Sequence, residues 1–433
     1  MSDSRYGRTR SAVHALLGLF LYTGCATQQD GPSATRDRAF ITYSPPAEGN
    51  KGLRLAVKDL IDTKGVVTTA GSEFLAKNSP AAKRDAACLA IARRRNVQFV
   101  GKTNTTELAV APSGINQYFG TPKNPLSSRR NLIPGGSSSG SAVAVANGTA
   151  DVAFGTDTAG SIRVPAACCG ITGLKTTFGL VPLDGVFPIA PKHLDTVGPM
   201  AKDVARVVQG MDLLQAGFAG EYQRAVATQP SAEKIRIGRL YLSGTNKKVD
   251  SAVDAALAAA KFEVVNLDAG FKEKWVQAQA DAATVAATNA YVYDQQFLKE
   301  PELRVRTKAV ILLGRVQYKT AYQDALRRQA AWRAEMGRVL KQVDFIALPT
   351  LQTLPPRVPF RGGSVAFEAR TLLLQNTAAV NFAGVPALAL PIPIRDRAVP
   401  MTSLQLIGPN RSEAALLNAG RLVEAATRPS AGS

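Results

Sequence analysis

Short apolar runs alternate with stretches of helical periodicity along much of the chain. LRLAVKD at residues 53–59 is an apolar run that ends in charge, which predicts a strand whose end opens toward a site. AAKRDAACLAIARRRN at residues 81–96 has the spacing of an amphipathic helix, and VQFVGKTN after it predicts another strand. This strand–helix–strand order predicts an α/β fold with a mixed central β-sheet covered by helices on both faces.

The remainder of the chain continues the alternation. Residues 118–141 are rich in Gly, Ser, Pro and Asn, so we expect mostly loop there. A small-residue helix, a break at Gly148 and a strand then lead to GTDTAGSIRVPA at residues 155–166. A second strand–helix–strand passage precedes a long helical region at residues 273–341, and two late strands and a closing helix follow. No clear linker divides this body, so we predict one large domain over residues 51–433.

The first residues have the pattern of an export signal. Three arginines precede the apolar run AVHALLGLFLY, and the TGC that follows makes Cys25 resemble the lipidated cysteine of a bacterial lipoprotein. Residues 1–24 are then a lipoprotein-type signal peptide and residues 25–50 a polar tether. The mature protein is expected on the periplasmic side of the cell envelope, anchored to the membrane through lipidated Cys25. The alternatives are an ordinary or uncleaved secretory signal and a cytoplasmic protein.

Charge narrows the choice of partner only slightly. Lys and Arg total 52 and Asp and Glu 33, a net charge of +19. Removing residues 1–24 takes away three Arg and one Asp and leaves 49 − 32 = +17. This excess favours anionic partners such as nucleic acid or an anionic membrane surface. The basic residues are scattered over predicted helices and form no nucleic-acid motif, so we expect no nucleic-acid partner.

The cysteines carry no chemistry that the sequence can identify. Besides Cys25 the chain has Cys88, Cys168 and Cys169, without CxxC spacing. This excludes a disulfide framework and a zinc site by pattern, and we expect all three in the core.

Three segments combine small residues with reactive side chains. Lys58 lies in AVKDLIDTKG, Ser137 in PGGSSSGSAVAVA and Ser161 in GTDTAGSIRVPA. The GGSSSGS run lacks the Gly-Lys-Ser/Thr of a P-loop, which disfavours a phosphate site. A nucleophilic Ser161 needs a proton acceptor, and the chain has only His14 and His193. A Ser-His-Asp hydrolase using His193 stays open but is disfavoured, because its setting is loop-like and no G-x-S-x-G elbow accompanies it.

Taken together, these segments resemble the amidase signature family. The resemblance covers residues 51–426, weakest at 219–341, and includes GKTNTTELA, TPKNP, PGGSSSGSAVAVA, GTDTAGSIRVPAACCGITGLKTT, LDTVGPMA and NFAGVPALALP in the usual order. It implies an amidohydrolase that acts on linear carboxamides through a Ser–Ser–Lys triad. Ser161 would be the nucleophile that forms an acyl-enzyme, Ser137 would relay its proton, and Lys58 would be the base. A lysine must be desolvated to act as a base near neutral pH.

The same resemblance implies that backbone N–H groups of Thr158, Ala159 and Gly160 form the oxyanion hole. The family more often has glycine at the position of Ala159. The methyl group of Ala159 is therefore expected to leave slightly less room in the oxyanion hole, and a positive φ at this residue would be unfavourable. Asp157 and Arg163 flank the turn and are expected to hold its shape rather than react.

Further expectations follow from the resemblance. A cis peptide bond precedes Ser137 in the family, a small-molecule amide is the substrate, and no metal or organic cofactor is implied. Ser139 is a second position where glycine is commoner. Two other functions stay open: the glutaminase subunit of a tRNA-dependent amidotransferase, and a catalytically inactive, membrane-tethered binding protein on the same fold. The amide's identity and the oligomeric state are not predicted.

Overall fold

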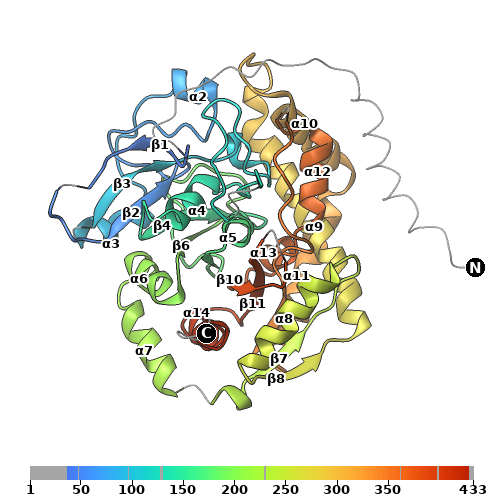
Figure 1. The fold of residues 1–433 in the computed structure, drawn as a ribbon. Helices are drawn as coiled ribbons and strands as arrows, with labels where there is room; N and C mark the ends of the chain where they lie inside the picture. The colour runs from blue at the N-terminus through green and yellow to red at the C-terminus, as the bar shows by residue number, and fades with distance from the viewer. Residues whose placement is uncertain are drawn as a thin grey trace, which may run out of the picture.

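A computed structural model gives the fold (Figure 1). It describes residues 37–46, 48–95, 97–126, 130–228, 231–360, 362–396 and 399–428. The predicted signal peptide, Cys25 and the tether residues before position 37 lie outside the described residues.

The described part of the chain contains one sheet of eleven strands. The strands are β1 (Phe40–Tyr43), β2 (Arg54–Lys58), β3 (Gln98–Thr103), β4 (Val152–Asp157), β5 (Thr172–Lys175), β6 (Thr196–Ala201), β7 (Arg236–Arg239), β8 (Glu263–Asn266), β9 (Phe345–Pro349), β10 (Ala387–Pro393) and β11 (Met401–Ile407). Their order is β1-β3-β2-β4-β6-β5-β10-β11-β9-β7-β8. The pairs β3–β2, β2–β4, β9–β7 and β7–β8 are parallel, and the other pairs are antiparallel.

Helices occupy most of the connections between strands. They are α2 (Glu73–Asn78), α3 (Ala90–Arg94), α4 (Ser139–Ala146), α5 (Arg163–Cys169), α6 (Val204–Leu214), α7 (Phe218–Thr228), α8 (Lys247–Ala259), α9 (Ala269–Asp294), α10 (Val305–Thr320), α11 (Tyr322–Val339), α12 (Val365–Leu373), α13 (Ala378–Ala383) and α14 (Glu413–Thr427). Short 3-10 turns lie at Ala87–Leu89, Glu107–Ala109, Ala232–Lys234 and Gln295–Phe297. None of the helices in the described ranges combines the length and apolarity needed to cross a bilayer.

Alternating side chains of the strands divide the core between the two faces of the sheet. In β4, Val152 and Phe154 join a cluster formed with α6, α7, α8 and α14. Ala153, between them, joins a cluster on the opposite face with α4 and α5. On that same opposite face, Ile346 of β9 packs with α9, α11 and α13. Helices therefore cover both faces, as a two-residue side-chain period in buried strands requires (Figure 1).

The predicted single-domain α/β fold with a mixed sheet and helices on both faces is confirmed, but two boundaries differ. β1 pairs with β3, so the folded body begins before the boundary expected at residue 51. The helix expected over residues 81–96 is reduced to a 3-10 turn and α3. Its first residues bond elsewhere, because the Ala82 N–H donates to the carbonyl of Val66 and its carbonyl accepts from Gly65.

Candidate active site

The parallel pair β2–β4 brings two candidate segments to one edge of the sheet. Lys58 is the last residue of β2, and Thr156 and Asp157 end β4. Because the carboxyl ends of parallel strands meet at the same edge, the Lys58 side chain reaches Thr156, and its Nζ donates to Thr156 Oγ1 at 2.8 Å. Sequence adjacency alone does not reveal this contact.

Ser137 lies beside the same amine group, just before α4. Its Oγ is 2.7 Å from Lys58 Nζ, and both side chains are fully buried. The Gly136–Ser137 peptide bond is cis, as expected from the resemblance. The carbonyl of Ser137 accepts hydrogen bonds from Thr105 Oγ1 at 2.8 Å and from the Ser139 N–H at 2.8 Å. These bonds fix the backbone that presents the hydroxyl.

The environment of Lys58 favours its neutral form. Burial lowers the pKa of Lys58 from 10.5 to about 7, against the opposing charges of Asp157 and Asp195. Desolvation disfavours the charged amine, and here it outweighs the nearby carboxylates. A substantial fraction of Lys58 is therefore unprotonated near neutral pH, as a general base requires.

Ser161 lies in the turn that joins β4 to α5. Its carbonyl accepts a hydrogen bond from the Ser138 N–H at 3.2 Å, which places the two serine-bearing segments side by side. Ser161 is partly exposed, whereas Ser137 is buried. Among the described residues, none forms a hydrogen bond with the Ser161 hydroxyl, and Ser137 Oγ is instead bonded to Lys58 Nζ.

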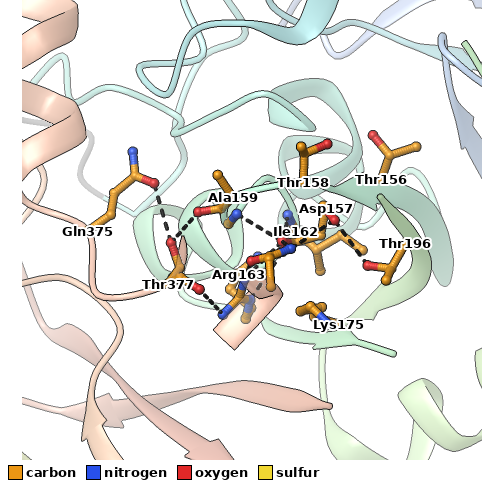
Figure 2. A network of polar contacts seen from close by, with 12 residues as sticks. Thr156, Asp157, Thr158, Ala159, Ile162, Arg163, Lys175, Thr196, Gln375 and Thr377 are labelled. Carbon is orange, nitrogen blue, oxygen red and sulfur yellow. Dashed lines mark hydrogen bonds and ion pairs between the residues drawn. The ribbon is translucent and has the colours of Figure 1, made fainter. Parts of the chain in front are cut away.

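The turn around Ser161 is organised by the buried carboxylate of Asp157 (Figure 2). Asp157 accepts from the backbone N–H groups of Gly160 at 2.8 Å and Ile162 at 3.0 Å, and it pairs with the guanidinium of Arg163 at 2.9 Å. Burial raises the pKa of Asp157, but the charge and hydrogen bonds of Arg163, the charge of Lys175 and the hydrogen bond from Asn381 together outweigh burial and hold that pKa well below its usual range. Asp157 and Arg163 therefore act on the shape of the turn.

One of the predicted oxyanion donors already has a hydrogen-bond partner within the turn. The Gly160 N–H points at Asp157 Oδ1, so it is not aimed at an oxyanion in this structure. In this turn, which lies wholly within the described ranges, the N–H groups of Thr158, Ala159 and Ser161 have no partner. This corrects the expectation for Gly160 and moves the candidate donors to the residues around it.

Thr377 holds the other side of the turn. Its Oγ1 donates to the carbonyl of Ala159 at 2.5 Å (Figure 2). Gly160 has φ +134°, and a Cβ there would overlap Thr377 Oγ1. Ala159 has no positive φ, so the strain considered for its methyl group does not arise. The conformation that needs glycine is at position 160, one residue further along.

Thr158 has a second anchor on the chain. Its Oγ1 donates to the buried carboxylate of Asp195 at 2.6 Å, and that carboxylate also accepts from the N–H groups of Ile189 and Ala190. Burial raises the pKa of Asp195, and these hydrogen bonds oppose the rise. The LDTVG segment thus supports the turn through a residue that sequence reasoning left without a role.

His193 is not placed as the base of Ser161. Its Nε2 lies 3.5 Å from the hydroxyl of Tyr322, and burial, with the nearby charges of Arg333 and Lys192, lowers its pKa below 6.5. The ring of His193 therefore contacts a residue of α11.

The remaining polar candidates do not form a metal site. Within the described ranges, no cluster of three or more His, Cys, Asp or Glu side chains is placed to hold a metal ion. Cys88, Cys168 and Cys169 are buried thiols, as expected, and burial raises the pKa of each.

Sequence reasoning missed the residues that hold the site from far along the chain. Arg163 Nη1 donates to Gln405 Oε1 at 2.7 Å, and Asn381 Nδ2 donates to Asp157 Oδ1 at 2.8 Å. Both partners lie on the late segments α13 and β11. Asn381 belongs to the NFAGVPALALP motif, which was a signal for it, whereas Gln405 carries none.

Comparisons with known proteins identify the family. A family model described as Amidase matches residues 44–417. A glutamyl-tRNA(Gln) amidotransferase subunit of Halobacterium salinarum is 32% identical, over 89% of this chain and 99% of the relative. The 2-amino-5-chloromuconic acid deaminase of Comamonas testosteroni is 33% identical, over 86% and 81%. A crystal structure of an amidase superposes with a TM-score of 0.71 at 27% identity, over 87% of this chain and 85% of that one. The chain belongs to the amidase family, which hydrolyses C–N bonds of amides.

Proposed function

We propose that the protein hydrolyses the C–N bond of a small linear carboxamide through an acyl-enzyme on Ser161. One observation carries the proposal: Lys58 Nζ and Ser137 Oγ lie 2.7 Å apart in a fully buried setting that lowers the pKa of the lysine to about 7. Ser137 and Lys58 then supply the proton acceptor that a histidine-poor chain otherwise lacks.

The first half-reaction forms the acyl-enzyme. Neutral Lys58 accepts the hydroxyl proton of Ser137, which takes the proton of Ser161 as Ser161 Oγ bonds to the amide carbon. Free N–H groups of Thr158 and Ala159 donate to the oxygen that gains charge, a contribution of about 3–4 kcal/mol per donor in other enzymes. The C–N bond breaks, and the proton returns from Lys58 through Ser137 to the leaving nitrogen.

The second half-reaction releases the acid. Water attacks the ester carbon of the acyl-enzyme, and the same Lys58–Ser137 pair takes the water's proton and returns one to Ser161 Oγ. Every step uses groups of this chain and water. The products are a carboxylic acid and ammonia or an amine.

A fluorophosphonate probe tests the assignment directly. We expect it to label Ser161 in the full chain, and we expect Ser161→Ala to abolish both labelling and turnover of a panel of simple aliphatic and aromatic amides. Lys58→Ala should slow turnover about 10²–10⁴-fold, the usual contribution of a general base, while far-UV circular dichroism stays unchanged. His193→Ala is the matched control and should keep near-normal rates. Normal rates in Lys58→Ala with inactive His193→Ala would overturn the triad.

A glutaminase subunit of an amidotransferase is the second candidate. It is favoured by the relative from Halobacterium salinarum, whose length is matched almost completely. Under this function, glutamine would release ammonia faster than simple amides do. Glutamine turnover no faster than the best member of the amide panel would exclude it.

We also propose, from the sequence alone, that the mature protein is a lipoprotein of the cell envelope anchored through Cys25. Mass spectrometry of the mature amino terminus tests this proposal. Diacylglycerol on Cys25 with residues 1–24 removed is the expected result, and an intact Met1 would refute it.

A further inference from the structure

Helix α10 has one face packed on the protein and one face turned outward. Its inner face is fixed by close contacts: a Cβ at Gly314 would overlap the carbonyl oxygen of Ala287 on α9. Thr307 Oγ1 donates to Glu107 at 2.5 Å, and Arg306 pairs with Glu368 at 3.2 Å. The rotation of α10 about its own axis is therefore determined, and so is the set of side chains that it presents outward.

The outward face is apolar to a degree unusual for a surface helix. Val305, Leu312, Leu313 and Val316 are 36–62% exposed. They are spaced by seven, one and three residues, which aligns them in one stripe along an α-helix. Singly exposed apolar residues need no explanation, but an aligned stripe on one helix marks an interaction surface.

A basic stripe runs beside the apolar one. Lys308, Arg315 and Lys319 each follow one residue of the apolar stripe, Val305, Leu312 or Val316, by three positions, so they flank that stripe on one side. None of the three forms an ion pair with the described part of the chain. All sixteen residues of α10 are described, and none of them is acidic.

We propose that this α10 outer face, formed by the two stripes, docks on the surface of an anionic phospholipid bilayer. Charge complementarity selects this occupant. A basic stripe next to an apolar stripe is the pattern of a helix lying in the plane of a membrane interface, with cations at the anionic headgroups and apolar side chains among the acyl chains. A second copy of the chain is a less favourable occupant of this face, because its own basic stripe would repel the basic stripe of the first copy.

The inner side of α10 is hydrogen-bonded to a loop that also contacts the candidate site. Glu107 accepts hydrogen bonds from the N–H of Arg304, the N-cap residue of α10, and from Thr307 Oγ1 in the helix. The preceding residue, Thr106, donates its N–H to the carbonyl of Ser137 at 3.4 Å. Two successive residues of the loop after β3 therefore connect α10 to the backbone of Ser137.

Vesicle binding of the full chain tests the proposal. We expect co-sedimentation with vesicles that contain phosphatidylglycerol, weaker binding at high salt, and little binding to phosphatidylcholine alone. The triple variant Lys308→Gln/Arg315→Gln/Lys319→Gln should bind about 100-fold more weakly, at about fivefold per charge. Leu312→Gln/Val316→Gln should weaken binding about tenfold or more. Val276→Gln, on α9 and 58% exposed, is the control and should change binding less than about twofold.

Hydrogen–deuterium exchange separates this face from any other membrane-binding part of the chain. Phosphatidylglycerol vesicles should protect amides of α10 and leave those of α8 unchanged. Unprotected α10, or vesicle binding that both sets of variants leave intact, would overturn the proposal. So would light scattering that shows a dimer dissociated by Leu312→Gln/Val316→Gln, since the occupant would then be a second copy.

Discussion

Two buried lysines with equally lowered pKa values lie near the candidate site, and their partners distinguish them. Burial lowers the pKa of both Lys58 and Lys175 to about 7, with the charge of Arg163 adding to the effect at Lys175. Lys58 faces the hydroxyl of Ser137, to which it can return a proton. Within the part of the chain that the structure describes, Lys175 donates to the carbonyls of Thr176 and Val385 alone, and these have no proton to exchange. Geometry therefore assigns proton transfer to Lys58.

This assignment predicts the pH dependence of amide hydrolysis. A lowered lysine pKa means that the neutral form is populated above it, so kcat/KM should be flat above a midpoint near pH 7. Below that midpoint it should fall about tenfold per pH unit, because only neutral Lys58 accepts a proton. Initial rates across the pH range measure the midpoint. The midpoint should be the same in the variant Lys175→Met. Loss of the pH dependence in that variant would contradict the assignment.

Gly160 is the position in the nucleophile turn where a side chain is least tolerable. Its φ is +134° and a Cβ would overlap Thr377 Oγ1, so Gly160→Ala should lower the free energy of unfolding by about 2 kcal/mol or more. Labelling of Ser161 by the fluorophosphonate probe should fall at least tenfold, since the turn must move. Gly148→Ala is the matched control, because Gly148 has φ +79° but open space around it. It should cost about 1 kcal/mol and leave labelling unchanged.

The residues that could be named from sequence are those on short motifs. Lys58, Ser137 and Ser161 stand in small-residue segments whose order resembles a known family, so each could be found before the fold was known. Thr377 and Gln405 were not found, because each meets the turn only through a fold that joins residues more than 200 positions apart. Long-range partners of this kind leave no local pattern.

At the scale of elements, periodicity identified the strands better than the helices. The runs LRLAVKD, KIRIGRLYL and VDFIALPT, at residues 53–59, 234–242 and 343–350, predict strands, and they contain β2, β7 and β9, whose residues are mostly buried. The region at 273–341 was predicted as helical but divides into α9, α10 and α11. β5 and β6 were missed, since TGLK and TVGPMA are short and rich in small residues.

The packing of α10 on α9 gives a prediction in which helix propensity and contact oppose one another. Alanine in place of glycine inside a helix usually stabilises by about 1 kcal/mol. Gly314→Ala should do the opposite, because its Cβ would overlap the carbonyl of Ala287 and force the two helices apart. Gly337→Ala in α11 is the control, since no atom lies within 4 Å of its Cβ position. Thermal unfolding should show a lower Tm for the first variant and an equal or higher Tm for the second.

At the scale of the whole molecule, the early and late parts of the chain complete each other's polar groups. Asp157 and Arg163 come from the segment that carries Ser161, and their partners Asn381 and Gln405 come from the last third of the chain. In the sheet, β5 pairs directly with β10, so the hydrogen-bonded ladder is continuous between the two parts. The late part completes the hydrogen bonding of the turn that carries Ser161, and we expect the two parts to unfold together.

Cooperative unfolding can be followed with probes in two different parts of the fold. The two tryptophans, Trp275 and Trp332, lie in contact on α9 and α11, whereas the fluorophosphonate probe reports on Ser161. Urea should abolish native tryptophan fluorescence and probe labelling at one midpoint. Asn381→Leu removes two hydrogen bonds to Asp157, which should cost about 1–3 kcal/mol and move both midpoints down together. If labelling were lost at a lower urea concentration than tryptophan fluorescence, the site would unfold as a separate unit, because its bonds to the late segments would then contribute too little to couple it to the helices.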